Sequence, residues 1–232
     1  MGIRSLNRFL QKRCKNLLPE GLEKLLDKTI AIDANNYLYQ IINGNLLKNL
    51  DDACKVFKKY NIETIWIFDG YPPEYKKKII TQRRNYFTSL HRKHHMLSQI
   101  KKADKSINKT MNEIAKKMRK LTSDDIINVK KYLELNNYKY FVTNREVEAD
   151  TMCVDLAKNK TVYAVLSEDT DIIGMVCPIT IRNFDKTNET CVYYNIDSIV
   201  TDLKITICEF KKMCGIVTEN CSVEKAFELI NT

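Results

Sequence analysis

Three short apolar segments of this chain each end in an aspartate. They are TIAID at 29–33, TIWIFD at 64–69 and VYAVLSED at 162–169, and all are rich in β-branched and aromatic residues. Short apolar runs of this kind are typical of buried strands. Segments with helical periodicity lie between them, so strand and helix alternate along the chain. The alternation predicts an α/β fold with a mostly parallel central sheet that helices cover on both faces.

The sequence predicts one more strand and several helices besides these three segments. A fourth strand is expected at 138–142, with helices over 37–60 and 124–135, and two more helical segments at 208–217 and 222–230. The 232 residues suit one domain with a small appendage. The start of the chain does not resemble a signal peptide, and no apolar run reaches the length of about eighteen residues that a membrane span needs. We therefore expect an intracellular protein without a membrane partner.

Positive charge is concentrated in one part of the chain. The net charge is +9, and residues 76–120 hold 15 Lys and Arg against 2 acids. The stretch from 74 to 120 contains strong helix formers and almost no Gly or Pro, so we expect two or more basic helices that project from the sheet. Such a segment suits a polyanionic partner, whereas a solvated helical face is the simpler alternative.

The histidines and cysteines do not form a recognisable metal motif. His91, His94 and His95 all lie in the basic segment without nearby Cys, Asp or Glu, so we expect them to face phosphate or solvent. None of the eight cysteines shows the spacing of a zinc or redox motif. We expect them to be reduced thiols in the core.

Acidic side chains follow each of the four expected strands. The carboxyl ends of parallel strands share one edge of a sheet, which is where ligands bind in folds of this class. Any one of these acids could instead be a helix cap or a turn former. The shared placement nevertheless predicts that six acids from four segments meet at one edge. They are Asp33, Asp69, Glu146, Glu148, Asp169 and Asp171.

Such a cluster requires a cation. Two carboxylates about 4 Å apart repel by roughly 1 kcal/mol in water and nearer 4 kcal/mol at an effective dielectric of about 20. Oxygen ligands without Cys or His favour magnesium or manganese over zinc. Two such ions about 3.5 to 4 Å apart can hold a phosphate between them. The acids alone therefore indicate metal-dependent phosphate chemistry, with phosphodiester hydrolysis as the natural reaction.

Five blocks resemble the flap-endonuclease and XPG-type family, in the order that the family has them. They are the initial MGI, AIDANNYLYQ (31–40), FDGYPPEYK (68–76), REVEAD (145–150) and SEDTDIIG (167–174). The segment 116–141 is similar to the stretch that leads into the family's paired-Glu block, and the resemblance covers roughly residues 1 to 200. It implies a PIN-like 5′-nuclease fold with a helical arch. It also implies metal-dependent cleavage of DNA at 5′ flaps or junctions, in replication, repair or recombination.

The resemblance gives the six acids separate roles toward two Mg²⁺ ions, for which Mn²⁺ is expected to substitute. The expected first-ion ligands are Asp33, Asp69 and Glu148, the second-ion ligands are Asp169 and Asp171, and Glu146 would act directly or through bound water. Asp150 lies where the family has no ligand, so it is not assigned to the site.

Basic and aromatic residues are assigned in the same way. Lys76 and Arg83 match the family's two catalytic basic residues, and their separation of two helical turns places them on one helix face. Tyr39 matches an aromatic that stacks on a base, although core packing is a close alternative. Gly2 resembles a glycine that lies close to DNA. The other expected DNA-binding residues are Arg84, Lys116, Lys117, Arg119 and Lys120.

The C-terminal part departs from the family pattern. No glycine follows Gly215, where the family has a Gly-rich hairpin that grips duplex DNA. Asn220 stands where the family has an aspartate, and it supplies an oxygen without a charge, so the second ion is expected either to bind more weakly or to rely on Asp169 and Asp171. We expect one nuclease domain over 1–232, with a basic helical arch insertion at 74–122 and a shortened, helix-turn-helix-like tail at 203–232.

The expected partner is DNA with a junction between a 5′ single strand and a duplex, bound by a monomer. A sliding-clamp partner cannot be inferred. Two alternatives stay open. The first is a 5′ to 3′ exonuclease acting on DNA or RNA, which would share the initial MG and a D-G motif. The second is a non-catalytic, DNA-structure-binding family member, which Asn220 and the shortened tail would fit.

Overall fold

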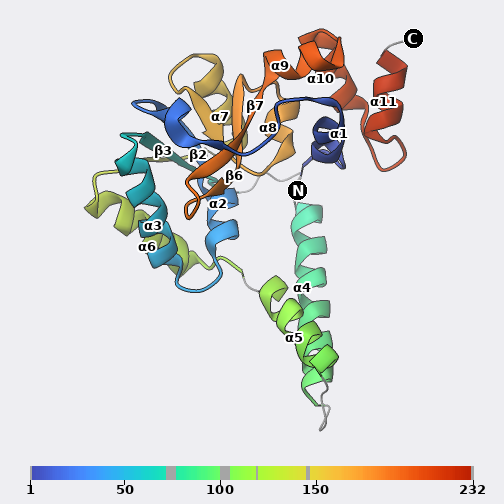
Figure 1. Cartoon of the computed structure of the whole chain (residues 1–232). Helices are drawn as coiled ribbons and strands as arrows, with labels where there is room; N and C mark the ends of the chain where they lie inside the picture. The colour runs from blue at the N-terminus through green and yellow to red at the C-terminus, as the bar shows by residue number, and fades with distance from the viewer. Residues whose placement is uncertain (1, 72–76, 100–104, 119, 145–146, 231–232) are drawn as a thin grey trace.

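The described residues form one seven-stranded mixed sheet. The computed structural model describes residues 2–71, 77–99, 105–118, 120–144 and 147–230. The strand order is β1-β7-β6-β5-β2-β3-β4 (Figure 1). All neighbours from β6 to β4 are parallel, whereas β7 is antiparallel to β6 and β1. The predicted mostly parallel sheet is therefore confirmed. The strands are β1 (Glu20–Gly21), β2 (Thr29–Asp33), β3 (Glu63–Phe68), β4 (Lys139–Val142), β5 (Ala164–Leu166), β6 (Ile179–Asp185) and β7 (Thr190–Asn195).

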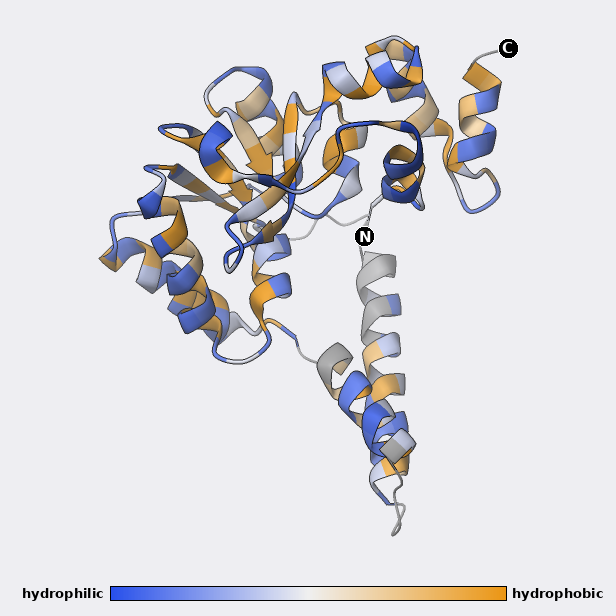
Figure 2. Ribbon diagram, in the orientation of Figure 1, coloured by the Kyte–Doolittle hydropathy of each residue, from blue (hydrophilic) through white to orange (hydrophobic). Residues whose placement is uncertain are grey.

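Helices cover both faces because successive strand residues point to opposite sides. On β2, Ile30 and Ile32 belong to one buried cluster and Ala31 to another. The Ile30 side packs against three helices, and the Ala31 side packs against two. They are α2 (Ala34–Ile41), α3 (Leu46–Lys59) and α6 (Ser123–Leu135) on the first face, and α7 (Ala149–Lys158) and α8 (Thr170–Gly174) on the second. Figure 2 shows the apolar strands enclosed by these layers.

A third buried cluster lies beyond β7, where Val192 and Tyr194 pack against the terminal helices. These are α1 (Leu6–Arg13), α9 (Ile196–Leu203), α10 (Ile207–Ile216) and α11 (Val223–Ile230), and the short 3-10 helix η1 (Leu22–Leu25) follows β1. All eight cysteines are free thiols, and six of them are buried. None of the described helices has the length and apolar character that crossing a membrane requires.

Two helices project from the body where the sequence predicts a basic insertion. They are α4 (Lys77–Ser98) and α5 (Lys105–Met118), here called the projecting pair (Figure 1). Leu90 on α4 and Ile114 on α5 are buried, although most described side chains of the pair are polar (Figure 2). His91, His94 and His95 lie on α4. No three His, Cys, Asp or Glu side chains in the described part of the chain are grouped closely enough to hold a metal.

The structure contains elements that the sequence did not predict, among them α1 and β1, and it differs in two further places. The periodic segment 37–60 forms two helices, because Gly44 takes a positive φ of 89° and the Asn45 side chain caps α3 by accepting the Lys48 N–H. The β6–β7 hairpin was not predicted. Thr180 and Arg182 of β6 are both buried, so the strand lacks a purely apolar run that would mark it.

The buried residue Trp66 on β3 gives a test of the core. Its ring is completely buried, meets the Tyr37 ring edge-on, and donates its Nε1–H to Thr64 Oγ1 at 3.0 Å. Trp66→Ala should lower the free energy of unfolding by about 3 to 5 kcal/mol, measured by urea denaturation. Leu135→Ala is the control, because Leu135 is 80% exposed and should change stability by less than about 0.5 kcal/mol. Equal losses in the two variants would contradict this packing.

Candidate functional site at the carboxyl edge of the sheet

Two pairs of aspartates lie where the parallel strands end. Asp33 is the last residue of β2, and Asp69 directly follows β3. Asp169 lies three residues after β5 and caps α8, and Asp171 lies in the first turn of that helix. Because β2 is hydrogen-bonded to both β3 and β5, these strand ends are neighbours. These four residues are called the acid edge below.

Asp33 is a buried carboxylic acid whose pKa is strongly raised. Its side chain is only 6% exposed. The pKa of Asp33 is raised to about 7, chiefly by burial and also by the negative charges of Asp69 and Asp150, although hydrogen bonds from Asn36 and Ser167 oppose the shift. Without a cation, Asp33 therefore keeps a proton up to about neutral pH. A bound cation would replace that proton.

Asp171 belongs to the second pair and shows the same effect. Its pKa is raised by burial, then by the charges of Asp169 and Asp150. Asp150 therefore acts on one member of each pair, Asp33 and Asp171. Asp150 is not among the predicted site residues, because the family resemblance assigns it no role. Its position in the first turn of α7, two residues after Glu148, is the signal that could have identified it.

Hydrogen bonds hold the carboxylates of the first pair in place and link that pair to the backbone of Asp169. Ser167 Oγ donates to Asp33 Oδ2 at 3.0 Å and accepts the Asp169 N–H at 3.1 Å, so one hydroxyl connects the two pairs. The Asn35 side chain donates to Asp69 Oδ2 at 3.0 Å. Sequence reasoning missed Ser167 and Asn35. Both are polar residues within two positions of a predicted acid, and that adjacency is the available signal.

Helix α7 adds a further contact to the acid edge. Glu148 is its N-cap residue, and the Ala149 N–H donates to Asp69 Oδ1 at 3.0 Å. The start of α7 therefore lies against Asp69, as the predicted role of Glu148 requires. Glu146 lies outside the described residues.

Gly2 lies against the second pair. It has a positive φ of 97°, and a Cβ added there would lie 2.3 Å from Asp169 Oδ1 and 2.3 Å from Thr170 Oγ1. Thr170 Oγ1 also donates to the Ile3 carbonyl at 3.2 Å. The structure thus gives a reason for glycine within the protein itself, in addition to the predicted approach of DNA.

The other predicted residues within the described part of the chain lie on α2, on the projecting pair and just before α6. Tyr39 on α2 is 45% exposed, so it is not a core side chain. Lys120 is exposed, with Nζ 5.8 Å from the centre of the Phe87 ring. Four of the predicted residues lie on the projecting pair at positions whose side chains are not described, namely Arg83, Arg84, Lys116 and Lys117. Lys76 and Arg119 lie outside the described residues.

Asn220 lies in the loop between α10 and α11. It is exposed, and its N–H donates to Thr218 Oγ1 at 3.3 Å. With Arg4 and Ser5 it lines a cavity of about 390 Å³. The hydrogen bonds of the described residues do not join Asn220 to the acid edge, so its predicted role toward the second ion stays a prediction.

The donors of the acid edge fit a hard divalent cation. The described acids gather as two pairs, and no three described His, Cys, Asp or Glu side chains form a closer group. Burial first, and then the charges of neighbouring acids, raise the pKa of Asp33 and Asp171, so a cation beside these carboxylates would be favourable. Carboxylate oxygens are the ligands that Mg²⁺ and Mn²⁺ prefer.

Two models of one protein family match the chain. The XPG N-terminal domain matches residues 1–89, and the XPG I-region matches residues 140–220. Together they span more than half of the chain and include both aspartate pairs. The chain belongs to the XPG family.

Curated relatives of this XPG-family chain are named flap endonuclease 1. The protein of Encephalitozoon cuniculi is 28% identical over 245 residues, which cover 97% of this chain and 69% of the relative. That of Methanocaldococcus jannaschii is 30% identical over 212 residues, covering 83% and 62%. Against the Cryptosporidium parvum protein the match covers 49% of the relative. The chain thus spans about half to two thirds of the length of these relatives.

Solved structures of the family share the fold. The catalytic core of Rad2 in complex with DNA substrate superposes with a TM-score of 0.70 at 17% identity, covering 99% of this chain and 67% of that one. Flap endonuclease-1 from Methanococcus jannaschii superposes with a TM-score of 0.63 at 23% identity, covering 99% and 77%. The predicted nuclease-type α/β fold is therefore confirmed.

The raised pKa of Asp33 predicts how stability varies with pH in metal-free protein. The folded chain holds this proton up to about pH 7, whereas the unfolded chain releases it near the ordinary value of 3.8. Stability should therefore fall as pH rises between these values. Asp33→Asn removes the charge. In EDTA, the melting temperature of this variant should exceed that of the wild type above pH 7 and match it near pH 3.8.

Asp155→Asn on the exposed side of α7 is the matched control and should follow the wild type at every pH. Added Mg²⁺ should raise the melting temperature of the wild type and of the control. It should raise the melting temperature of Asp33→Asn much less. A difference between Asp33→Asn and the wild type that does not change with pH would refute the assignment of this proton.

Proposed function

We propose that this chain is a divalent-metal-dependent, structure-specific 5′ nuclease that hydrolyses DNA at 5′ flaps or junctions. The observation that carries the proposal is the acid edge, two aspartate pairs on an XPG-family sheet beside a projecting helix pair. In the reaction, a water oxygen attacks phosphorus and the bond to the 3′ oxygen breaks, which leaves a 3′-hydroxyl and a 5′-phosphate.

The acids would divide between two Mg²⁺ ions. Asp33, Asp69 and Glu148 would hold one ion, and Asp169 with Asp171 would hold the other, with Glu146 acting directly or through water. When bound, such ions supply Lewis-acid activation of water and neutralise charge on the phosphate. Mn²⁺ has similar ligand preferences and should substitute.

The protein's own residues orient the reacting groups. Ser167 and Asn35 donate hydrogen bonds to the carboxylates of Asp33 and Asp69, and Ser167 also accepts the Asp169 backbone N–H, so the edge is organised before substrate arrives. Lys76 and Arg83 would neutralise charge that develops on the phosphate. Tyr39 would stack on a base near the cleaved bond.

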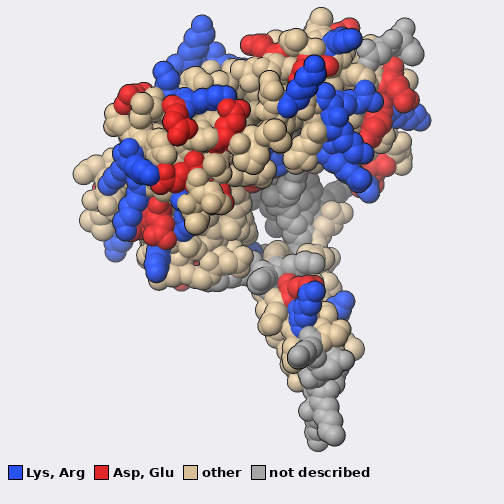
Figure 3. Space-filling model, viewed as in Figure 1, with Lys and Arg blue, Asp and Glu red and all other residues tan. Residues whose placement is uncertain are grey.

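Positive charge outside the edge would bind the DNA backbone. Residues 76–120 carry 15 Lys and Arg. On the face in Figure 3, Lys and Arg side chains also gather over α1, whose last turn holds Lys12 and Arg13. Binding through phosphates releases counterions, so affinity should fall steeply with salt.

The substrate class is supported by the relatives. The curated ones are named flap endonuclease 1, and solved relatives include human GEN1 in complex with Holliday junction DNA. Labelled 5′-flap, gapped and nicked duplexes, with and without Mg²⁺, test the proposal, and an RNA arm and a blunt duplex test the exonuclease alternative. Flap binding without cleavage in Mg²⁺ or Mn²⁺ would instead identify a non-catalytic family member.

Asp169→Asn tests the metal assignment. The amide can still cap α8, but it removes one charge from the second pair. We expect Mg²⁺-dependent cleavage to fall by at least about 100-fold, as for loss of a group that stabilises transition-state charge, while flap affinity changes little. Asp155→Asn is the control and should cleave normally. Unchanged turnover by Asp169→Asn in single-turnover assays would refute the assignment.

Lys76→Ala and Arg83→Ala test the two basic residues. Each should slow single-turnover cleavage far more than it weakens flap affinity, because the charge on the phosphate is greatest in the transition state. Arg92→Ala, further along α4, is the control and should show a small loss that appears mainly in affinity. Parallel losses of rate and affinity in Arg83→Ala would mean that it only binds the backbone.

A further inference from the structure

A groove beside Asp69 takes no part in the proposed cleavage reaction. It is an open cavity of about 660 Å³ between residues 69–71, helix α6 and the end of β4. This volume lies within the range of about 300 to 1,000 Å³ that ligand sites occupy. Asp69, a member of the acid edge, therefore forms part of the wall of this groove.

The groove exposes apolar side chains that soluble proteins usually bury. Tyr71 is 74% exposed, Ile127 is 57% exposed and Val142 is 46% exposed, and all three line it. Ile126 is partly buried and forms more of the lining. On α6 the lining positions are three, four and seven residues after Ser123, so they share one face of the helix. Concentrated exposed apolar surface of this kind marks a binding site.

One cation and one anion also line the groove. The Lys130 ammonium lies 4.9 Å from the centre of the Phe68 ring and 5.9 Å from that of Tyr140, so the rings favour its position in the wall. Asp69 is the anion and a proposed metal ligand. A ligand with a phosphate for Lys130 and an apolar face for Ile127 would fit this lining, and a nucleotide has both.

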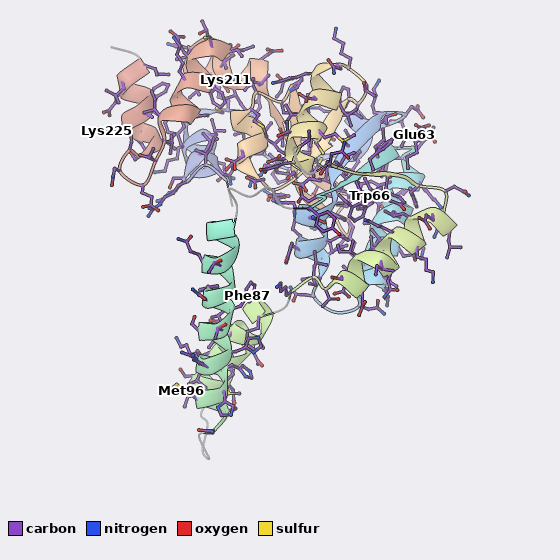
Figure 4. The ribbon with its side chains drawn as sticks, turned by 180° about the vertical axis from the view of Figure 1, so that it is seen from behind. Glu63, Trp66, Phe87, Met96, Lys211 and Lys225 are labelled. Carbon is purple, nitrogen blue, oxygen red and sulfur yellow. The ribbon has the colours of Figure 1, made fainter. Side chains whose placement is uncertain are left out.

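The place of the groove in the fold indicates which nucleotides reach it. Residues 69–71 precede α4, and α6 begins at Ser123, shortly after α5. In Figure 4, which views the molecule from behind, α5 leads across to α6 at the lower side of the body. The groove therefore lies where the projecting pair joins the body, beside the acid edge.

We propose that this groove binds the bases of an unpaired DNA arm as the strand leaves the acid edge. The inference rests on the proposed function and adds a base-binding subsite to it. Paired bases hide their flat faces inside the duplex stack, whereas unpaired bases can lie against aromatic and aliphatic side chains. The groove thus selects a single-stranded arm over a continuous duplex.

The test measures how much of the flap affinity depends on the bases of the arm. Fluorescence anisotropy would compare a normal flap with one whose arm is abasic, using Ca²⁺ in place of Mg²⁺ to prevent cleavage. The variants are the wild type, Ile127→Glu in the groove and Leu135→Glu. Leu135 lies on the same helix, is 80% exposed and does not line the groove, so Leu135→Glu is the matched control.

The wild type and Leu135→Glu should lose affinity by about tenfold when the arm is abasic, as expected for one or two stacked bases. Ile127→Glu should bind the normal arm about tenfold more weakly and lose little more when the bases are removed. An equal abasic penalty in all three proteins, or no penalty in any, would overturn the subsite. Cleavage by the wild type on the same flap in Mg²⁺ tests the proposed function separately.

Discussion

Repulsion between carboxylates at one edge of a sheet is the constraint on which this structure depends. Parallel strands bring their carboxyl ends together, so acids that end separate strands must become neighbours. Burial of Asp33 and the proximity of Asp150 increase the electrostatic cost. The fold accepts this cost because the surrounding core is extensive, with two buried clusters that sandwich the sheet and a third beyond β7. The edge is thus a site where stability is lower than the same fold could reach with neutral residues, as is usual for functional sites.

Neutral polar residues make this arrangement of charges specific. The hydroxyl of Ser167 touches both aspartate pairs, and the Asn36 side chain accepts the Glu168 N–H at 3.0 Å, so the loop after β5 is tied to the helix after β2. Arg182 adds an ion pair to Glu168 at 3.2 Å from the neighbouring strand β6. Apart from that ion pair, these bonds come from neutral groups, so they hold the acid edge in place without adding negative charge.

Much of the fold could be predicted because strands such as TIAID and TIWIFD are short, apolar and separated by helical segments. The placement of acids after these strands also indicated which edge carries the site. The β6–β7 hairpin was missed because its buried positions include the polar residues Thr180 and Arg182, and the Arg182 guanidinium is held by the Glu168 carbonyl on another segment. Ser167, Asn35 and Asp150 were missed for a related reason. Their nearness in sequence to predicted acids is a local signal, but the contacts that give them a role form only after distant segments meet.

The contact between Gly2 and Asp169 has a practical consequence for how the protein is prepared. Because even a methyl group at position 2 would collide with the aspartate, a peptide fused ahead of Gly2 would begin beside the acid edge. An affinity tag with histidines placed there would offer competing nitrogen ligands to any added metal. Titrations of Mg²⁺ or Mn²⁺ are therefore cleaner with the tag after α11, which packs in the cluster beyond β7.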